Sequence, residues 1–189
     1  MSGTGMSGFS AERLLAHRFE ARRHAYAPRD AILYALGVGL GRDPVDPVDL
    51  AFLDETRLSV LPTFAATLAS PGLWVKEPSL GIDWVRLVHA AQAAEFQAPL
   101  PPSAEVTGAA RVASVTDHGA ERGAEVVVER TIADAASGRI HCTLRQTLLL
   151  RGNGGFAARP APRPAREPVP ERAPDATAAF DVSPRAALI

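Results

Sequence analysis

The chain has 189 residues and a formal net charge of −1, and 47% of its residues are hydrophobic while 22% are charged. These are the proportions of an ordinary globular protein, so they argue against a disordered chain and leave room for one domain with a core, alone or with a tail. The balanced charge, without a continuous basic stripe, gives no reason to expect a nucleic-acid partner or an acidic membrane surface.

Cysteine usage and hydropathy narrow the class further. Cys142 is the only cysteine, which excludes a disulfide within the chain and a cysteine-rich zinc site. We interpret it as a small apolar residue in a strand. No apolar run reaches membrane-spanning length, and residues 1–10 lack the basic start and the apolar core of a secretory signal. We expect a soluble protein in a reducing compartment, without a cofactor or a metal.

The N-terminal part of the chain predicts short helices. Residues 1–10, rich in Gly and Ser, should be flexible, and residues 11–24 suit a short helix or strand with one buried face. Pro28 and Asp30 fit the first turn of a longer helix. The apolar face expected for this helix is Ile32, Leu33 and Leu36, and the glycines that end it are Gly37, Gly39 and Gly41.

A turn-rich link follows this helix, with the pairs Asp43-Pro44 and Asp46-Pro47. We expect a short strand over residues 50–54. Pro62 then opens a second short helix, which Pro71-Gly72 closes. Helix and turn therefore dominate the first part of the sequence.

From Trp84 onward the pattern predicts long strands joined by tight turns. The expected strands cover residues 84–96, 105–116, 125–134 and 139–150. The residues expected to share one side are Val106, Gly108, Ala110 and Val112 in the second strand and Val126, Val128 and Ile132 in the third. In the fourth, Ile140, Cys142, Leu144, Leu148 and Leu150 alternate with His141, Thr143, Arg145 and Thr147. Helices followed by antiparallel strands indicate an α+β architecture, a sheet with helical material on one face.

Three motifs that suggest ligands are better explained by local structure. The glycines of residues 37–41 follow a helix, whereas a dinucleotide loop follows a strand and opens a helix, so we interpret them as a helix cap. The glycines of residues 152–155 resemble a phosphate loop, but no Gly-Lys-Ser/Thr follows, which favours a tight turn leaving the sheet. His17, Glu20 and His24 would share one helix face, which is far more often a solvated polar face than a metal site.

His89 lies in an apolar run between Leu87 and Ala91. A core histidine held by a hydrogen bond is the ordinary interpretation, and a polar group presented at a pocket wall is the functional one. Composition alone favours the first. The sequence contains no Gly-x-Ser-x-Gly elbow and gives no basis for a Ser-His-Asp triad.

Six runs in a fixed order carry a resemblance to a known family. They are Tyr26 to Gly39, Val60 to Ala65, Leu87-Val88-His89 with Gln92, Pro99-Leu100-Pro101, Asp117-x-Gly119, and Arg151-Gly152-x-Gly154-Gly155-Phe156. Together they resemble the N-terminal hot-dog domain of the MaoC-like, (R)-specific 2-enoyl-CoA hydratases. This family, also called hydratase 2, includes a domain of peroxisomal multifunctional enzyme type 2.

The resemblance implies the first repeat of a double hot-dog enzyme, each repeat being a bent antiparallel sheet wrapped on a helix. The family adds water to a trans-2-enoyl-CoA to give the (R)-3-hydroxyacyl-CoA, in fatty-acyl or sterol-side-chain β-oxidation. Its water-activating Asp/His pair belongs to the second repeat, and that motif does not occur in these 189 residues, so no catalytic residue is expected here.

The resemblance also implies partners and binding positions. The expected partners are an acyl-CoA or enoyl-CoA thioester and a second hot-dog domain or homodimer partner, in the bacterial cytoplasm or, for a eukaryotic protein, the peroxisome. The family's His-Gly pair falls on His89 and Ala90, and a basic residue of its Asp-Lys-Gly turn falls on His118. Ala90 adds a methyl group where backbone would approach a ligand, and His118 stands where the family has a lysine. His89, Ala90 and His118 are the predicted substrate-binding residues.

We therefore predict three segments. Residues 1–19 are a flexible lead-in and residues 20–156 the hot-dog domain. Residues 157–189, with seven of the 16 prolines, are a stiff linker that ends in what resembles a truncated start of a second repeat.

The predicted function is the acyl-CoA-binding half of the hydratase, inactive alone. The alternative is a non-catalytic hot-dog subunit that binds acyl-CoA or scaffolds a catalytic partner. A hot-dog thioesterase ranks last, because residues 63–69 carry no Asp or Glu.

Overall fold

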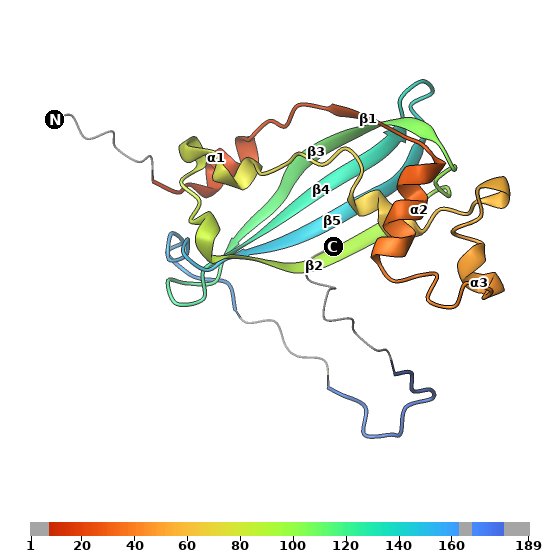
Figure 1. Ribbon diagram of the computed structural model, residues 1–189. Helices are drawn as coiled ribbons and strands as arrows, with labels where there is room; N and C mark the ends of the chain where they lie inside the picture. Colours follow the sequence, from red (N-terminus) through yellow and green to blue (C-terminus); the bar gives the residue numbers. More distant parts are fainter. Residues whose placement is uncertain (1–7, 163–167, 180–189) are drawn as a thin grey trace.

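The computed structural model describes residues 8–162 and 168–179 (Figure 1). Within these residues the α-helices are α1 (Ala11–Ala16), α2 (Pro28–Gly37) and α3 (Pro47–Leu50). Short 3-10 turns follow: η1 (Glu55–Arg57), η2 (Pro62–Ala66), η3 (Trp74–Lys76), η4 (Pro78–Leu80) and η5 (Trp84–Arg86). The strands are β1 (Arg22–Tyr26), β2 (Leu87–Phe96), β3 (Ala104–Asp117), β4 (Ala124–Asp134) and β5 (Ile140–Leu150).

The strands form one antiparallel sheet in the order β1-β3-β4-β5-β2. Figure 1 shows α1 toward one end of this sheet and α2 toward the other. Leu14 of α1 and Ala31 of α2 are both buried against the same side of the sheet, which we call the inner face. The predicted sheet with helical material on one face is confirmed.

Period-two alternation builds the core on the inner face. The buried strand residues include Val106 and Val112 of β3, Val126, Val128 and Ile132 of β4, and Cys142, Leu144, Leu148 and Leu150 of β5. They divide into two clusters, one beneath α2 and η2 that includes Phe64 and Ile132, and one beneath α1 that includes Leu14 and Val126. Cys142 is fully buried, as predicted for a small apolar residue, and burial raises the pKa of its thiol.

Three β-bulges interrupt the alternation, and they explain one wrong prediction. The extra residues are Ala90 in β2, Ala113 in β3 and His141 in β5, since each lacks a partner in the register. The bulge in β5 reverses the expected sides of its first residues: Ile140 is 44% exposed, whereas His141 is only 6% exposed. A single extra residue shifts every preceding side chain to the other face.

Helix α2 has the predicted bounds but a different buried face. Asp30 Oδ2 accepts a hydrogen bond from the Ala27 backbone N–H at 2.9 Å and closes the first turn. The buried residues are Ala31 and Ala35, one turn apart, while Leu33 is 58% and Leu36 47% exposed. The predicted face of Ile32, Leu33 and Leu36 is therefore wrong for both leucines. Two small alanines let the helix backbone approach the layer beneath it closely.

The glycines after α2 end the helix as predicted, because Gly39 and Gly41 have φ values of 102° and 78°. The strand expected over residues 50–54 is wrong. Asp46 instead caps α3, since its Oδ1 accepts from the Val48 N–H at 2.8 Å. The second helix begins at Pro62 as predicted, but it is the 3-10 turn η2.

The ends of the chain differ from the predicted segments at one point. Residues 1–19 were expected to be a flexible lead-in, yet α1 forms within them and Leu14 is fully buried, so the folded domain begins before residue 20. Residues 157–162 and 168–179 have no helix or strand, and the segment resembling the start of a second repeat lies outside the described residues. No helix among the described residues is long and apolar enough to cross a membrane.

Candidate functional site

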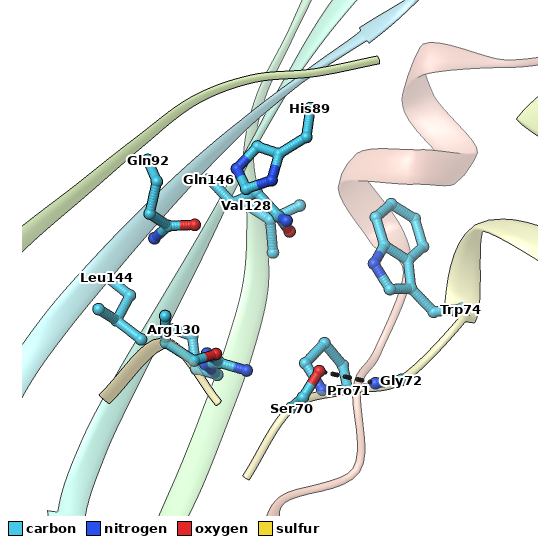
Figure 2. Close-up of a pocket in the computed structure, with 11 residues that line it drawn as sticks. Ser70, Pro71, Gly72, Trp74, His89, Gln92, Val128, Arg130, Leu144 and Gln146 are labelled. Atoms are coloured by element: carbon cyan, nitrogen blue, oxygen red, sulfur yellow. Dashed lines mark hydrogen bonds between the residues drawn. The ribbon is translucent and has the colours of Figure 1, made fainter. Parts of the chain in front are cut away.

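A pocket of about 190 Å³ opens on the inner face, between the sheet and the segment of residues 66–74. Its sheet wall carries His89 and Gln92 of β2, Val128 and Arg130 of β4, and Leu144 and Gln146 of β5. Figure 2 shows Trp74 and the Ser70–Gly72 segment facing this wall across the pocket. Leu144 belongs to the first hydrophobic cluster and Val128 to the second, so the pocket lies where the two clusters meet.

The bulge at Ala90 places His89 and Gln92 on the same wall. Residues three apart in a regular strand point to opposite faces, but the extra residue between them restores a common side. His89 lies opposite Leu148, and Gln92 lies opposite Gln146. His89 Nε2 is 3.0 Å from the Ala91 carbonyl oxygen. His89 is therefore an exposed side chain at a pocket wall, not a core histidine.

Arg130 brings a charge into this largely apolar face. Its Nη2 donates to the Ala66 carbonyl oxygen at 2.6 Å, and its Nε is buried without a hydrogen-bond partner. No carboxylate of the described residues forms an ion pair with it. Burial lowers the pKa of the guanidinium, but an arginine remains protonated in such surroundings.

Sequence reasoning missed Arg130 and Gln146, although a signal was present. Both occupy inward positions of alternating strands, between Val128 and Ile132 in β4 and between Leu144 and Leu148 in β5. A polar residue in an otherwise apolar inward series marks either a satisfied buried group or a pocket. The pairing of β4 with β5 sets Arg130 opposite Leu144 and Gln146 opposite Val128, so the two polar residues are diagonal neighbours.

The other predicted binding residues lie in different places. Ala90 is the bulge residue of β2, next to His89. His118 follows β3, and β4 and β5 separate that strand from β2. The His118 side chain is 15% exposed, with Nε2 3.9 Å from Glu125 Oε2, and it does not line the pocket. The structure thus brings His89 and Ala90 together but not His118, and contact of any of them with a substrate stays a prediction.

Next to His118, the Asp117 carboxylate joins two of the runs that carry the family resemblance. Its oxygens accept backbone N–H groups from Gly119 at 2.8 Å, Gly155 at 2.8 Å and Ala157 at 2.6 Å. Although burial acts to raise it, these N–H donors hold the pKa of Asp117 below its usual range. Gly155 has a φ of 84°. The glycines of residues 152–155 therefore form a turn around the chain's own carboxylate, as the tight-turn interpretation predicted.

The weak metal hypothesis finds no support in the described residues, where no group of three or more His, Cys, Asp or Glu could hold an ion. His17 follows α1 and its ring stacks on Trp74, with centroids 5.7 Å apart. His24 lies in β1 and its Nδ1 accepts the Ala69 N–H at 3.0 Å. These two histidines belong to different elements and do not share a helix face.

Comparison with known proteins identifies the family. The family model described as MFE-2 hydratase 2 N-terminal domain matches residues 24–152. The chain belongs to this family. It is 35% identical over 170 residues to enoyl-CoA hydratase ChsH3 of Mycobacterium tuberculosis, covering 87% of this chain and 58% of that protein. It is 35% identical over 161 residues to the peroxisomal enoyl-CoA hydratase 2 of Arabidopsis thaliana, covering 82% and 52%. The chain thus spans about half the length of the curated relatives it matches.

Solved structures confirm the hot-dog fold. The MaoC-like dehydratase from Phytophthora capsici superposes with a TM-score of 0.73 at 25% identity, over 94% of this chain and 61% of that one. The ChsH1-ChsH2 complex from Mycobacterium tuberculosis gives a TM-score of 0.51 at 15% identity, over 80% of this chain and 93% of the matched chain, and shows the fold alone. The five-stranded sheet is therefore a MaoC-like hot-dog sheet of the enoyl-CoA hydratase and 3-hydroxyacyl-thioester dehydratase family.

Proposed function

We propose that this chain is the acyl-CoA-binding half of a 2-enoyl-CoA hydratase that forms (3R)-hydroxyacyl-CoA. The observation that carries the proposal is the pocket on the inner face of a hydratase 2 hot-dog sheet, with His89 on its wall. A concave site that combines apolar side chains with convergent polar groups suits part of an acyl chain. His89 and Ala90 border the acyl chain in this proposal, and His118 contacts the CoA.

A second hot-dog repeat completes the enzyme in this proposal. Hydration needs one group to activate water for attack on C3 of the enoyl thioester and another to supply the proton to C2. The pocket lining contains no Asp or Glu to act as the base. The second repeat, in the same chain or another, supplies the acid and base while this chain holds the substrate.

The free edge of the sheet supports such a partner. β2 is one of the two edge strands of the sheet, and its residues from Val88 to Phe96 are exposed. Most of them are small or apolar, with alanines at 90, 91, 93 and 94. A long, exposed, apolar edge strand is a template for pairing with another sheet. Among the solved structures of the same fold, ChsH1-ChsH2 is itself a complex.

The experiment is a calorimetric titration of the full chain with a medium-chain trans-2-enoyl-CoA, followed by a spectrophotometric hydration assay. We expect binding without hydration, and hydration once a catalytic hot-dog repeat is added. His89→Ala should weaken binding of the thioester. His118→Ala should weaken binding of the CoA thioester but not of the corresponding free fatty acid.

Absence of thioester binding, both alone and with the added repeat, would rule the proposal out. Binding without hydration in the presence of a repeat shown to be active in its own enzyme would favour the non-catalytic subunit instead.

A further inference from the structure

Arg130 differs from the arginines around it because its charge has no ion-pair partner among the residues that the structure describes. On the opposite, outer face, Arg111 and Arg145 flank Glu129 at 2.7 Å and 3.1 Å, and Arg23 pairs with Glu105 at 3.2 Å. Arg130 is more buried than these, yet its one hydrogen bond goes to a neutral carbonyl. A desolvated guanidinium without a counter-charge raises the free energy of the fold unless an anion approaches it.

The pocket around Arg130 offers hydrogen-bond donors to an anion and no carboxylate that would repel one. Gln92 and Gln146 line it together with Arg130, and Asp and Glu are absent from its lining. The Gln146 side chain makes no hydrogen bond to the residues the structure describes, so its amide N–H₂ is available. Figure 2 shows these side chains converging on one space from β2, β4 and β5.

The size of the pocket limits the anion. A volume of about 190 Å³ corresponds to about six water molecules. A carboxylate with a few methylene groups matches this volume. The apolar part of the wall, Val128 and Leu144, lies beside the donors and suits the last methylene groups of a chain.

We propose that this pocket binds a carboxylate at the far end of the acyl chain, so that the preferred substrate class is an enoyl thioester with a terminal carboxylate. Arg130 provides the charge, Gln146 and Gln92 provide additional donors, and Val128 and Leu144 contact the adjoining methylene groups. This inference rests on the proposed function, because it assigns the thioester end to the rest of the site. To the proposed function it adds a residue, Arg130, that selects acyl chains ending in a carboxylate.

The test compares matched pairs of trans-2-enoyl-CoA thioesters, of increasing chain length, that end either in a methyl group or in a carboxylate. Calorimetry on the full chain measures both dissociation constants. At the length that reaches Arg130, the carboxylate should bind about tenfold to a hundredfold more tightly than the methyl-terminated thioester, as expected for hydrogen bonds to a charged group. Equal or weaker binding of the carboxylate at every length would overturn the inference while leaving the proposed function intact.

Two variants locate the effect, with a third as the matched control. Arg130→Met should abolish the preference, and Gln146→Glu should abolish it too by placing a carboxylate beside Arg130. Arg145→Met removes an arginine from the outer face, one residue from Gln146, and should leave the preference unchanged. Cooperative thermal unfolding checks each fold, and the wild-type comparison decides the question even if a variant misfolds.

If neither thioester binds, the proposed function fails, and a separate experiment without CoA tests the anion site. A free medium-chain fatty acid and the alcohol of the same length then serve as probes. Preferential binding of the acid that is lost in Arg130→Met supports the site, and no preference overturns it.

Discussion

Asp117 and Arg130 both bring a charge to the inner face of the sheet, but the described residues supply a full set of partners only to Asp117. Asp117 is 5% exposed and accepts three backbone N–H groups from the turns at the end of β3 and after β5. Arg130 donates one hydrogen bond to Ala66 and has a buried Nε without a partner. The difference separates a charge whose partners come from the fold from a charge that, in our proposal, binds a ligand.

The contrast follows from the cost of taking a charge out of water. A buried charge is tolerated when hydrogen bonds replace its hydration, and Asp117 obtains these as the chain folds. For Arg130 the replacement is incomplete among the described residues, because its buried Nε has no hydrogen-bond partner. Substitutions at the two positions should therefore change different properties of the protein.

The largest effect on stability is expected for Asp117→Ala. Its removal leaves the N–H groups of Gly119, Gly155 and Ala157 without their acceptor, and we expect a loss of about 3 kcal/mol in the free energy of unfolding. Urea unfolding measures this loss. A decrease below about 1 kcal/mol would show that water replaces the carboxylate there, and the comparison with Arg130 would lose its basis.

Acid should remove the same contribution. Because the folded-state pKa of Asp117 lies below the unfolded value of about 3.9, its contribution is fully present above that pH and is lost as the pH falls through the folded pKa. Thermal unfolding of the wild type and of Asp117→Asn, from neutral pH to pH about 2, measures it. The gap between them should be constant above pH about 4 and narrow below it; a gap that widens in acid would contradict the assignment.

Arg130→Leu, unlike Asp117→Ala, should change the free energy of unfolding only slightly. Loss of the hydrogen bond to Ala66 costs about 1 kcal/mol, while removal of an unpaired, half-buried charge offsets that loss. We expect the free energy of unfolding to stay within about 1 kcal/mol of the wild type, by the same urea measurement. A loss as large as that of Asp117→Ala would mean that Arg130 holds the fold.

The smallest effect is expected on the outer face. Glu129→Gln weakens the pairs with Arg111 and Arg145, whose side chains are each 64% exposed. Exposed pairs contribute little, so we expect a loss of about 0.5 kcal/mol that shrinks further in high salt. Urea unfolding at low and at high salt measures both. A loss that is insensitive to salt would show that packing, not charge, is responsible.

The sequence was most informative about the sheet. In β4 and β5 one face is more buried than the other, so the alternation there predicts the strands and, after the bulge at His141, their inward residues. The helices were less predictable. The orientation of α2 depends on how closely its backbone approaches the layer beneath it. The small side chains of Ala31 and Ala35 permit a close approach and are buried, while the larger Leu33 is exposed. Hydrophobicity alone therefore predicted the wrong face.

The site was predictable only in part, for a related reason. His89 was identified from a family resemblance, and its position on the pocket wall depends on a bulge that the sequence does not announce. Arg130 and Gln146 follow from the alternation itself, as polar residues at inward positions. Whether such a residue is satisfied by the chain or directed into a pocket depends on the loop across from it, and that is a tertiary property.

The bulge at Ala90 also determines which side chains of β2 face the pocket. Deleting that one residue would straighten the strand and exchange the faces of Leu87, Val88 and His89, while Gln92 and the rest of the strand kept theirs. Val88 would then enter the pocket and His89 would leave it. The polarity of this wall therefore depends on the number of residues in β2 as well as on their identity, so a single deletion would change which side chains line the pocket without any substitution.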